Sequence, residues 1–396
     1  MIGTAESIFY HRDMNRDILA GDPFVLFDEK SQSFYVYATL EQGSERGWAF
    51  AIYKSKNLTD FSFLGYAYEM RKSTIGRDWF WAPEVYYSPH NGYYFMFYSC
   101  RVRKELNAFY FGDENFEEGC KICVAYSRSP EGPFIDFPDP ALDFFPYDPT
   151  YRNIDGKLEN YDEPIDDKEC SIGTFIPLID ANVLIDDQSI YLYASRNCYR
   201  NIHFDHSLNR YVESSEIVGV ELETDWYFSD KLVKPAVKSA YKHVYGQNKD
   251  GYREILSYRQ EPQEWENFNV SDFRKFRRHN RRWCEGSFIL PRVENQRKVY
   301  YLYYSANCYQ EENYDLGVAV SSSPLGPFAK FRGNPIGPKP NVYDICSIGH
   351  CSFTMRNQKY LCCFHGRKKI DQPRILCFAE LDDDMKRMEM LPLPSI

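Results

Sequence analysis

The chain has 396 residues, of which 26% are charged and 43% hydrophobic, as in an ordinary folded protein. Aromatic residues make up 17% of the sequence, and aromatic side chains favour strands over helices. The formal net charge is −10, which excludes a general binder of nucleic-acid backbones because such proteins need a basic surface. Composition therefore predicts β structure and disfavours a helical bundle, a coiled coil or a disordered chain.

Five short aromatic runs follow one another along the chain, and each is preceded by another apolar run and a turn. This pattern predicts five β-hairpins, over residues 23–39, 84–99, 182–195, 287–305 and 352–365. Third strands are expected at residues 49–55, 122–127 and 317–321. A turn of sequence Ser-Pro-x-Gly-Pro-Phe occurs twice, at residues 129–134 and 323–328, and no sustained helical periodicity competes with the strands.

Five repeats of about four strands are typical of a β-propeller, in which radially arranged sheets surround a central channel. We therefore predict an all-β fold: a single five-bladed β-propeller domain over residues 1–396, with blades that start near residues 22, 82, 180, 285 and 350. We interpret the long segments 136–178 and 199–283 as insertions between or within blades. A two-sheet sandwich is the alternative, but five copies of one hairpin favour radial repetition.

One basic run, residues 274–282, stands out in this acidic sequence, and we interpret it as a solvated loop. The first residues carry charges where a secretory signal would need an apolar core, and no apolar stretch reaches the ~20 residues of a membrane span. The 12 cysteines are scattered, which indicates buried thiols in a reducing compartment. Cys120 and Cys123 form half of a metal or redox motif, so we expect both in a structural strand. These features predict a cytoplasmic protein without a membrane or nucleic-acid partner.

Three of the five first strands open with an acidic residue after a turn-like lead: Asp22, Asp180 and Glu285. The start of each innermost strand of a propeller faces the channel mouth, so the symmetry of the fold would bring these side chains together. Two carboxyl groups, one protonated and one ionised, are the minimum machinery of glycoside hydrolysis, and a third nearby would raise the pKa of the acid. Each aspartate alone could simply cap a turn, but three equivalent placements favour a catalytic site.

Several short motifs occur in a fixed order along most of the chain. They are Gly21-Asp22-Pro23-Phe24, Trp81-Ala82-Pro83-Glu84, Ile179-Asp180-Ala181-Asn182-Val183, Glu285-Gly286, the second Ser-Pro-Leu-Gly-Pro-Phe turn and Gly349-His350-Cys351-Ser352-Phe353. The ordered set resembles glycoside hydrolase family 43, five-bladed propeller enzymes that act on arabinose- and xylose-containing polysaccharides. Ser287 and Cys351 depart from the family's common residues, but neither is a proposed acid or base.

The resemblance implies a role for each carboxylate. Asp22 matches the general base, Glu285 the general acid, and Asp180 the residue that tunes the pKa of the acid and orients the substrate. Because the family is inverting, Glu285 would protonate the leaving oxygen while Asp22 activates a water on the opposite face of the sugar. The acid and base should then lie ~6.5–9.5 Å apart, which leaves room for the water. Glu84 is expected to be structural instead of a fourth catalytic carboxylate.

The resemblance also implies substrate contacts and a metal ion. Trp81 and Phe24 would contact the sugar, and Arg367 would bind sugar hydroxyls, with Arg374 as a competitor for that role. His350 matches an axial histidine that in many members contacts a calcium ion (Ca²⁺) through water. The alternative for His350 is a histidine that only plugs the channel through hydrogen bonds.

We expect from this pattern an inverting exo-glycosidase that releases arabinofuranose, xylose or both from short plant oligosaccharides. An endo-arabinanase or a galactan-acting member of the family is an alternative. A non-catalytic carbohydrate-binding propeller or an interaction scaffold is disfavoured because all three carboxylates are present. A retaining, fructan-acting hydrolase would need its two carboxyl groups only ~5–5.5 Å apart.

Overall fold

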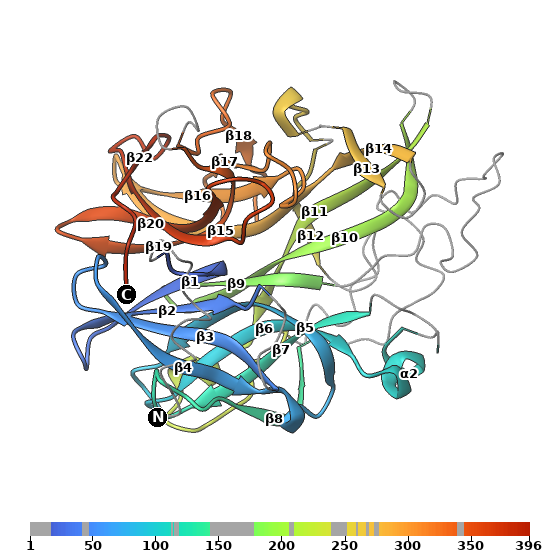
Figure 1. The fold of residues 1–396 in the computed structure, drawn as a ribbon. Coiled ribbons are helices and arrows are strands. Elements are labelled where there is room, and N and C mark those ends of the chain that lie inside the picture. The colour runs from blue at the N-terminus through green and yellow to red at the C-terminus, as the bar shows by residue number, and fades with distance from the viewer. Residues whose placement is uncertain are drawn as a thin grey trace.

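The structure, a computed structural model, describes residues 17–41, 47–111, 114, 119–142, 178–205, 210–238, 252–258, 260–266, 269–272, 277–338 and 344–396. In this part of the chain the strands form five sheets, which lie around a common axis (Figure 1). The innermost strands of neighbouring sheets contact one another in a closed ring. The predicted five-bladed β-propeller is confirmed, and each expected hairpin forms the inner two strands of one blade.

Four of the blades are antiparallel sheets of four strands in chain order. Blade 1 contains β1 (Gly21–Asp28), β2 (Ser33–Thr39), β3 (Trp48–Ser55) and β4 (Phe61–Glu69). Blade 2 contains β5 (Gly76–Tyr87), β6 (Tyr94–Val102), β7 (Cys120–Ser127) and β8 (Ile135–Ala141). Blade 4 contains β15 (Cys284–Glu294), β16 (Arg297–Ala306), β17 (Asp315–Ser321) and β18 (Ala329–Lys330). Blade 5 contains β19 (Cys346–Arg356), β20 (Lys359–Arg367), β21 (Ile375–Leu381) and β22 (Met388–Met390).

Blade 3 is larger because part of the second insertion extends its sheet. It contains β9 (Leu178–Asp186), β10 (Ser189–Asp205), β11 (Arg210–Leu222) and β12 (Arg253–Leu256). A further hairpin, β13 (Asn269–Asp272) and β14 (Arg277–Arg282), joins it because β14 runs parallel to the first part of β11 (Figure 1). The basic run was expected to be a loop, and this expectation was wrong for residues 277–282: residues 277–280 pair with β13 and residues 281–282 with β11, so they form a strand. Of the first insertion, residues 143–177 lie outside the described part of the chain.

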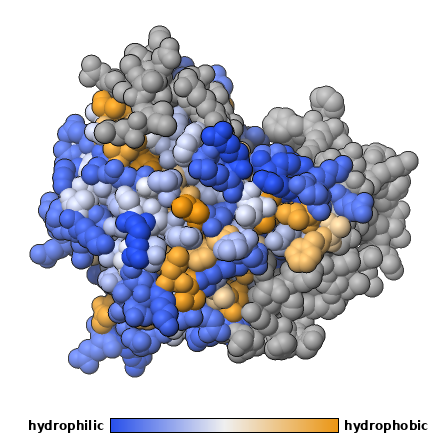
Figure 2. All heavy atoms as spheres, turned by 90° about the horizontal axis from the view of Figure 1, so that it is seen from below, coloured by the Kyte–Doolittle hydropathy of each residue, from blue (hydrophilic) through white to orange (hydrophobic). Residues whose placement is uncertain are grey.

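The described helices are short. They are α2 (Asn107–Phe111), α3 (Asp225–Phe228) and the 3₁₀ turns η1 (Met70–Lys72), η2 (Lys104–Leu106) and η4 (Glu264–Glu266). None of these helices has the length and apolar character that would let it cross a bilayer. On the face shown in Figure 2, apolar residues lie in small groups among hydrophilic ones. The apolar core lies instead between the blades, as in the cluster that joins β2 and β3 to β5 and β6.

The two Ser-Pro-x-Gly-Pro-Phe turns dock neighbouring blades in the same way. Tyr37 of blade 1 donates its hydroxyl to the carbonyl of Pro130 in blade 2 at 2.6 Å. Tyr193 of blade 3 donates to the carbonyl of Pro324 in blade 4, also at 2.6 Å. The glycine of each turn has a positive φ, 72° in Gly132 and 76° in Gly326, a conformation that glycine adopts without steric cost. The repeated sequence is therefore a repeated contact between blades.

The ring is closed by the residues just before β1. The N–H of Ala20 donates to the carbonyl of Arg374 at 3.0 Å, and the N–H of Leu376 donates to the carbonyl of Ile18 at 2.8 Å. These bonds tie the first described residues to the start of β21 in blade 5. They therefore hold Asp22 and Arg374 close together from opposite ends of the chain.

Candidate active site

All five innermost strands carry the same backbone irregularity near their first residues. A β-bulge interrupts the pairing of each strand with its neighbour, and one residue at each bulge has a positive φ between 44° and 57°. Bulges redirect side chains and are frequent beside active sites. The five bulge residues are Asp22, Ala82, Asp180, Gly286 and His350.

Each bulge residue is tied to the second strand of the preceding blade through its backbone N–H. The five donor–acceptor distances lie between 2.8 and 3.4 Å. Because a bulge removes an N–H from the strand ladder, these acceptors satisfy a group that would otherwise be buried without a partner. The acceptors are Thr39 Oγ1 for Ala82, Ser99 Oγ for Asp180, Ser195 Oγ for Gly286, Ser305 Oγ for His350 and His365 Nδ1 for Asp22.

The three carboxylates were predicted to occupy equivalent positions in their blades. This prediction is wrong for Glu285, which lies one residue before the equivalent position. Asp22 and Asp180 are bulge residues, whereas Glu285 precedes the bulge residue Gly286 and pairs with Ser305. Glu285 nevertheless lines the same cavity as both aspartates. The reason is that a bulge breaks the alternation of side chains, so two successive residues face the cavity, as Ile179 and Asp180 also do.

The cavity has a volume of about 450 Å³ and takes lining residues from all five blades. This size lies within the range of ordinary small-molecule pockets. Much of the wall is aromatic, with side chains suited to packing on the apolar face of a sugar. These aromatic residues are Trp79, Trp81, Trp283, Tyr309 and Tyr314.

Asp22 is held by an arginine from the other end of the chain. Arg374 donates from Nη1 to Oδ1 of Asp22 at 2.8 Å and from Nε to Oε1 of Glu41 at 2.6 Å. Burial is the largest influence on Asp22 and would raise its pKa, but the charge of Arg374, together with His350, His365 and a hydrogen bond from Thr39, outweighs burial and holds this pKa far below its usual range. Gly21 makes the arrangement possible, because a Cβ there would lie 2.3 Å from Nη2 of Arg374. Asp22 is therefore ionised over the whole working range of an enzyme.

Two histidines lie beside Asp22 as neutral groups. Nδ1 of His350 is 3.6 Å from Oδ1 of Asp22, and Nδ1 of His365 is 3.5 Å from the same oxygen. Burial lowers the pKa of both imidazoles, and the charge of Arg374 lowers it further. The cation that balances the Asp22 carboxylate is consequently Arg374.

Asp180 has the opposite electrostatic environment. Burial, followed by the negative charges of Glu285 and Asp22, raises the pKa of Asp180 well above its usual range. The hydroxyl of Ser195 donates to Oδ2 of Asp180 at 3.1 Å, which only partly offsets these effects. Asp180 and Glu285 therefore influence each other's ionisation.

Both oxygens of Glu285 accept a hydrogen bond. The indole Nε1 of Trp283 donates to Oε2, and the hydroxyl of Tyr314 donates to Oε1 at 2.8 Å. These two donors fix the plane of the carboxyl group at the cavity wall. Trp283 stands two residues before Glu285 in the sequence, so strand alternation could have pointed to it.

A stack of three flat groups supports the sugar-facing wall. The rings of Trp79 and Trp81 are parallel within 12° with centroids 5.0 Å apart, and the guanidinium of Arg101 lies 3.7 Å from the centroid of Trp79. At these distances Trp81 and Arg101 must occupy opposite faces of Trp79. Asp78 fixes the guanidinium through an Nη2–Oδ2 bond of 2.6 Å. Trp81 lines the cavity, and Trp79, which lines it too, supports the ring of Trp81.

Two predicted substrate contacts do not line the cavity. Phe24 is two residues beyond its bulge, one layer deeper in the channel, where its ring packs on Tyr86 and Phe288 at 5.4 and 6.4 Å. Arg367 is buried and donates from Nη1 to the carbonyl of Gln372. The arginine at the cavity is thus the competitor, Arg374.

Several lining residues were missed by the sequence analysis. Glu41 follows β2 and was not singled out, and Tyr309 and Tyr314 precede β17 in a segment without a motif. Tyr314 is 2% exposed, and nothing in its local sequence marks it as different from other core tyrosines. Glu84 lies in the channel, buried against Tyr86 and Asn182 and away from the cavity lining, in line with the structural role expected for it.

The described part of the chain shows no set of direct side-chain ligands for the calcium ion expected near His350. Across the part of the chain that the structure describes, no group of three or more His, Cys, Asp or Glu side chains could hold a metal. Ca²⁺ takes six to eight oxygen ligands, but the carboxylate nearest His350 is Asp22, which Arg374 already neutralises. Calcium therefore stays a prediction of the sequence resemblance, to be tested by activity before and after treatment with a chelator.

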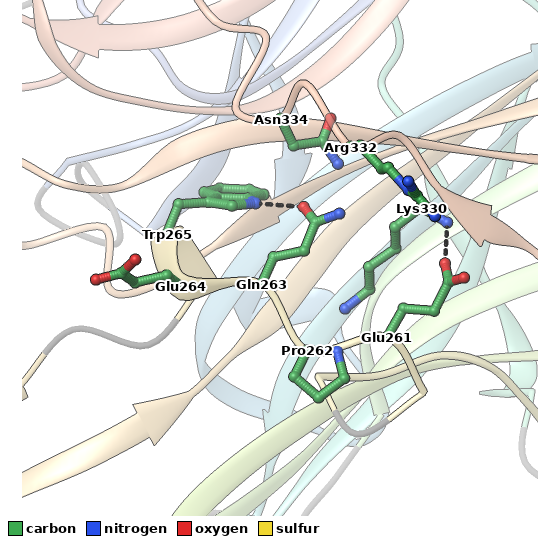
Figure 3. A pocket seen from close by; sticks show the side chains of 8 residues that line it. All are labelled: Glu261, Pro262, Gln263, Glu264, Trp265, Lys330, Arg332 and Asn334. Atoms are coloured by element: carbon green, nitrogen blue, oxygen red, sulfur yellow. Dashed lines mark hydrogen bonds between the residues drawn. The ribbon is translucent and has the colours of Figure 1, made fainter.

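A second cavity, of about 690 Å³, lies on the outer side of blade 4 (Figure 3). Its polar groups pair with one another: Trp265 Nε1 donates to Gln263 Oε1 at 2.7 Å, and the N–H of Lys330 donates to Glu261 Oε2 at 2.5 Å. The ammonium of Lys330 forms a buried ion pair of 2.8 Å with Glu266. These bonds dock residues 260–266 on the edge of the blade. We therefore assign this cavity a structural origin.

Comparison with known proteins agrees with this geometry. The model of glycosyl hydrolases family 43 matches residues 18–380. The chain belongs to this family. As a family 43 protein it is a glycoside hydrolase, and the cavity with its three carboxylates is its candidate active site. A search of curated proteins found no match.

Several solved structures resemble this family 43 chain over nearly their whole length. A thermostable family-43 glycoside hydrolase is 25% identical, with a TM-score of 0.61 and coverage of 95% of this chain and 94% of that one. An endo-1,4-β-xylanase from Bacteroides thetaiotaomicron VPI-5482 is 23% identical, with a TM-score of 0.62 and coverage of 96% and 98%. An α-L-arabinofuranosidase from Lactobacillus brevis is 15% identical, with a TM-score of 0.54 and coverage of 95% of both chains. The last two show the shared fold.

Proposed function

We propose that this glycoside hydrolase is an inverting exo-glycosidase that releases arabinofuranose, xylose or both from short plant oligosaccharides. The observation that carries the proposal is that Asp22, Asp180 and Glu285 line one cavity although they come from blades 1, 3 and 4. Their environments oppose one another: Asp22 faces a fixed cation that favours its ionised form, whereas burial and the charges of Glu285 and Asp22 favour the protonated form of Asp180. Carboxyl groups with opposed pKa shifts are the expected acid and base of a glycosidase.

The mechanism follows from this division. A water hydrogen-bonded to Asp22 attacks the anomeric carbon while the bond from that carbon to the leaving oxygen breaks. Asp22 takes a proton from the water, and Glu285 gives its proton to the leaving oxygen. Exchange with solvent then returns Asp22 to its ionised form and Glu285 to its protonated form.

The choice of sugar rests on the shape of the cavity and on related structures. A cavity of about 450 Å³ with aromatic walls suits one or two sugar rings at a chain end, which supports exo action. Structures with this fold include an α-L-arabinofuranosidase and a xylan β-1,4-xylosidase, which supports a pentose substrate. An endo-acting enzyme on xylan or arabinan is the second candidate, because an endo-xylanase and an endo-arabinase share the fold.

The assignment is tested by replacing the acid and the base. We expect Asp22→Asn and Glu285→Gln each to lower turnover of an arabinofuranoside or xyloside by about 10²–10⁴-fold, since that is the usual worth of general acid–base catalysis. Glu84→Gln is the matched control, because it replaces a buried carboxyl group of the same channel that lies outside the cavity. Acid or base variants that keep more than half of wild-type activity would refute the assignment.

Product stereochemistry tests the inverting mechanism separately. Proton NMR of the first product should show the anomer opposite to that of the substrate. Retention of configuration would instead indicate a covalent intermediate and the retaining alternative.

We further infer a cytoplasmic location, supported by the cysteines. Ten cysteines of the described part of the chain are free thiols, and Cys120 and Cys123 lie in β7 as expected. Buried free thiols are typical of a reducing compartment. Cell fractionation followed by immunodetection tests this inference, and an extracellular signal would contradict it.

A further inference from the structure

A buried tyrosine is wedged against the general acid of the proposed reaction. Tyr314 precedes β17, is 2% exposed, and donates its hydroxyl to Oε1 of Glu285 at 2.8 Å. Its ring lies parallel to the imidazole of His365 within 8°, with centroids 5.8 Å apart. Gly349 leaves room for this ring, because a Cβ there would lie 1.9 Å from Cε1 of Tyr314. The phenol therefore has one place to lie.

The hydrogen bond to Glu285 is the end of a chain with a fixed direction. The backbone N–H of His350 donates to Oγ of Ser305 at 2.8 Å, and Ser305 in turn hydrogen-bonds the phenol of Tyr314. A backbone N–H can only donate, so the Ser305 proton is directed to Tyr314 and the Tyr314 proton to Glu285. Hydrogen bonds in such a chain strengthen one another. Tyr314 is consequently a fixed and polarised donor to the carboxyl group.

We propose, on the basis of the proposed function, that Tyr314 is a positioning residue for the general acid and sets the pH above which Glu285 loses its proton. A donor to a carboxylate favours the ionised form, whereas the negative charge of Asp180 disfavours it. Tyr314 and Asp180 therefore act on Glu285 in opposite directions. Trp283 acts in the same direction as Tyr314, through the other carboxyl oxygen.

The other groups around Glu285 do not change charge over the working pH range. Burial raises the pKa of Tyr314, Tyr309 and the Cys284 thiol, so these stay protonated. His350 is held neutral by burial, and Arg374 stays charged because Asp22 and Glu41 raise its pKa further. Asp22 is ionised throughout. The group that titrates together with Glu285 is Asp180.

The test is the variant Tyr314→Phe, which keeps the ring stacked on His365 and removes only the hydroxyl. We expect the basic limb of kcat/KM against pH, measured on a natural disaccharide, to move up by about one to two pH units, the shift that follows from the loss of a hydrogen bond to the ionised form. Ser305→Ala should move it in the same direction by less, because it removes only the upstream link. Tyr309→Phe is the matched control, because its hydroxyl lies in the same cavity and bonds Gln310 instead of Glu285. A limb that stays in place in Tyr314→Phe would overturn the proposal.

A second measurement needs no substrate. Infrared titration of carboxyl groups in wild type and Tyr314→Phe, with Glu285→Gln to assign the signal, reports proton loss from Glu285 directly. An upward shift of this titration in Tyr314→Phe supports the role of Tyr314, and an unmoved titration overturns it. A wild-type protein that cleaves no glycoside would instead overturn the proposed function, so the two failures are distinguishable.

Discussion

Arg374 donates a 2.8 Å hydrogen bond to Asp22 across 352 positions of sequence, and this pair sets the charge of the proposed general base. The two residues meet because the segment before β1 is hydrogen-bonded to the start of β21, which closes the ring. Glu41 fixes the other edge of the guanidinium by accepting from both Nε and the backbone N–H of Arg374. Arg374 therefore takes part both in the closure of the propeller, through its backbone carbonyl, and in the ionisation of the proposed base, through its side chain.

Removal of this arginine should shift the acidic limb of the pH–rate profile. Arg374 is the largest influence that lowers the pKa of Asp22, so this pKa should rise in Arg374→Met. Asp22 then takes up a proton, and activity falls, at a higher pH than in wild type. A neighbouring arginine typically lowers the pKa of an aspartate by about 1–3 units, so we expect the acidic limb of kcat/KM to rise by a similar amount. Arg367→Met removes the same charge outside the cavity and should leave this limb in place. Equal shifts in both variants would show that only net charge matters.

The propeller could be predicted from the sequence because each blade repeats the same hairpin. Both faces of these strands are buried, so their sequences stay apolar and are easy to find. The sequence also predicted that Asp22, Asp180 and Glu285 lie close together, because the symmetry of the propeller relates the first residues of the innermost strands. It could not show that Glu285 precedes its bulge by one residue, since the conformation of Gly286 is not visible in residue types. It assigned Phe24 to the cavity because a motif does not distinguish successive layers of the channel.

Contacts made by loops and by distant segments could not be predicted from the sequence. Tyr314 and Glu41 act through neighbours in other strands, and their own local patterns resemble those of ordinary core and turn residues. Arg367 and Arg374 were open competitors because both lie near the start or end of a blade 5 strand. Only the register of β20 with β21 places Arg374 at the cavity and Arg367 beside it in the protein interior.

A buried carboxyl group in the channel should make stability depend on pH. Burial raises the pKa of Glu84 from its ordinary 4.5 to about 8 in the folded protein, even though Tyr86 and Asn182 hydrogen-bond it. Between these pH values the folded state keeps a proton that the unfolded state loses. The contribution of Glu84 to the free energy of unfolding is therefore fully present below about pH 4.5 and decreases as the pH rises toward 8. The slope is at most about 1.4 kcal/mol per pH unit.

The variant Glu84→Gln should remove this slope. Thermal melting of wild type and variant across that pH interval is the measurement, and the wild-type melting temperature should fall more steeply. Glu389→Gln, at an exposed position in β22, is the control for loss of one negative charge. Parallel melting curves for wild type and Glu84→Gln would contradict a titrating Glu84.

Asp180 decides whether the site works with three carboxylates or with two. The negative charge of one member of the Asp180–Glu285 pair disfavours ionisation of the other, so the second proton loss from the pair is displaced to higher pH. In Asp180→Asn only Glu285 titrates, without that repulsion, and the basic limb of kcat/KM should move to lower pH. This direction is opposite to the one expected for Tyr314→Phe. The double variant should therefore lie between the two single variants.

The measurement needs a substrate that depends on the acid. An aryl glycoside has an activated leaving group that needs little protonation, so the profile should be taken on a natural disaccharide with the aryl glycoside alongside it. Turnover should also fall, because Asp180 lines the cavity and loses its charge. If Asp180 only formed the bulge at the head of β9, Asp180→Asn would lower stability and leave the basic limb on the disaccharide where it is. An unmoved limb would refute the tuning role even if activity fell.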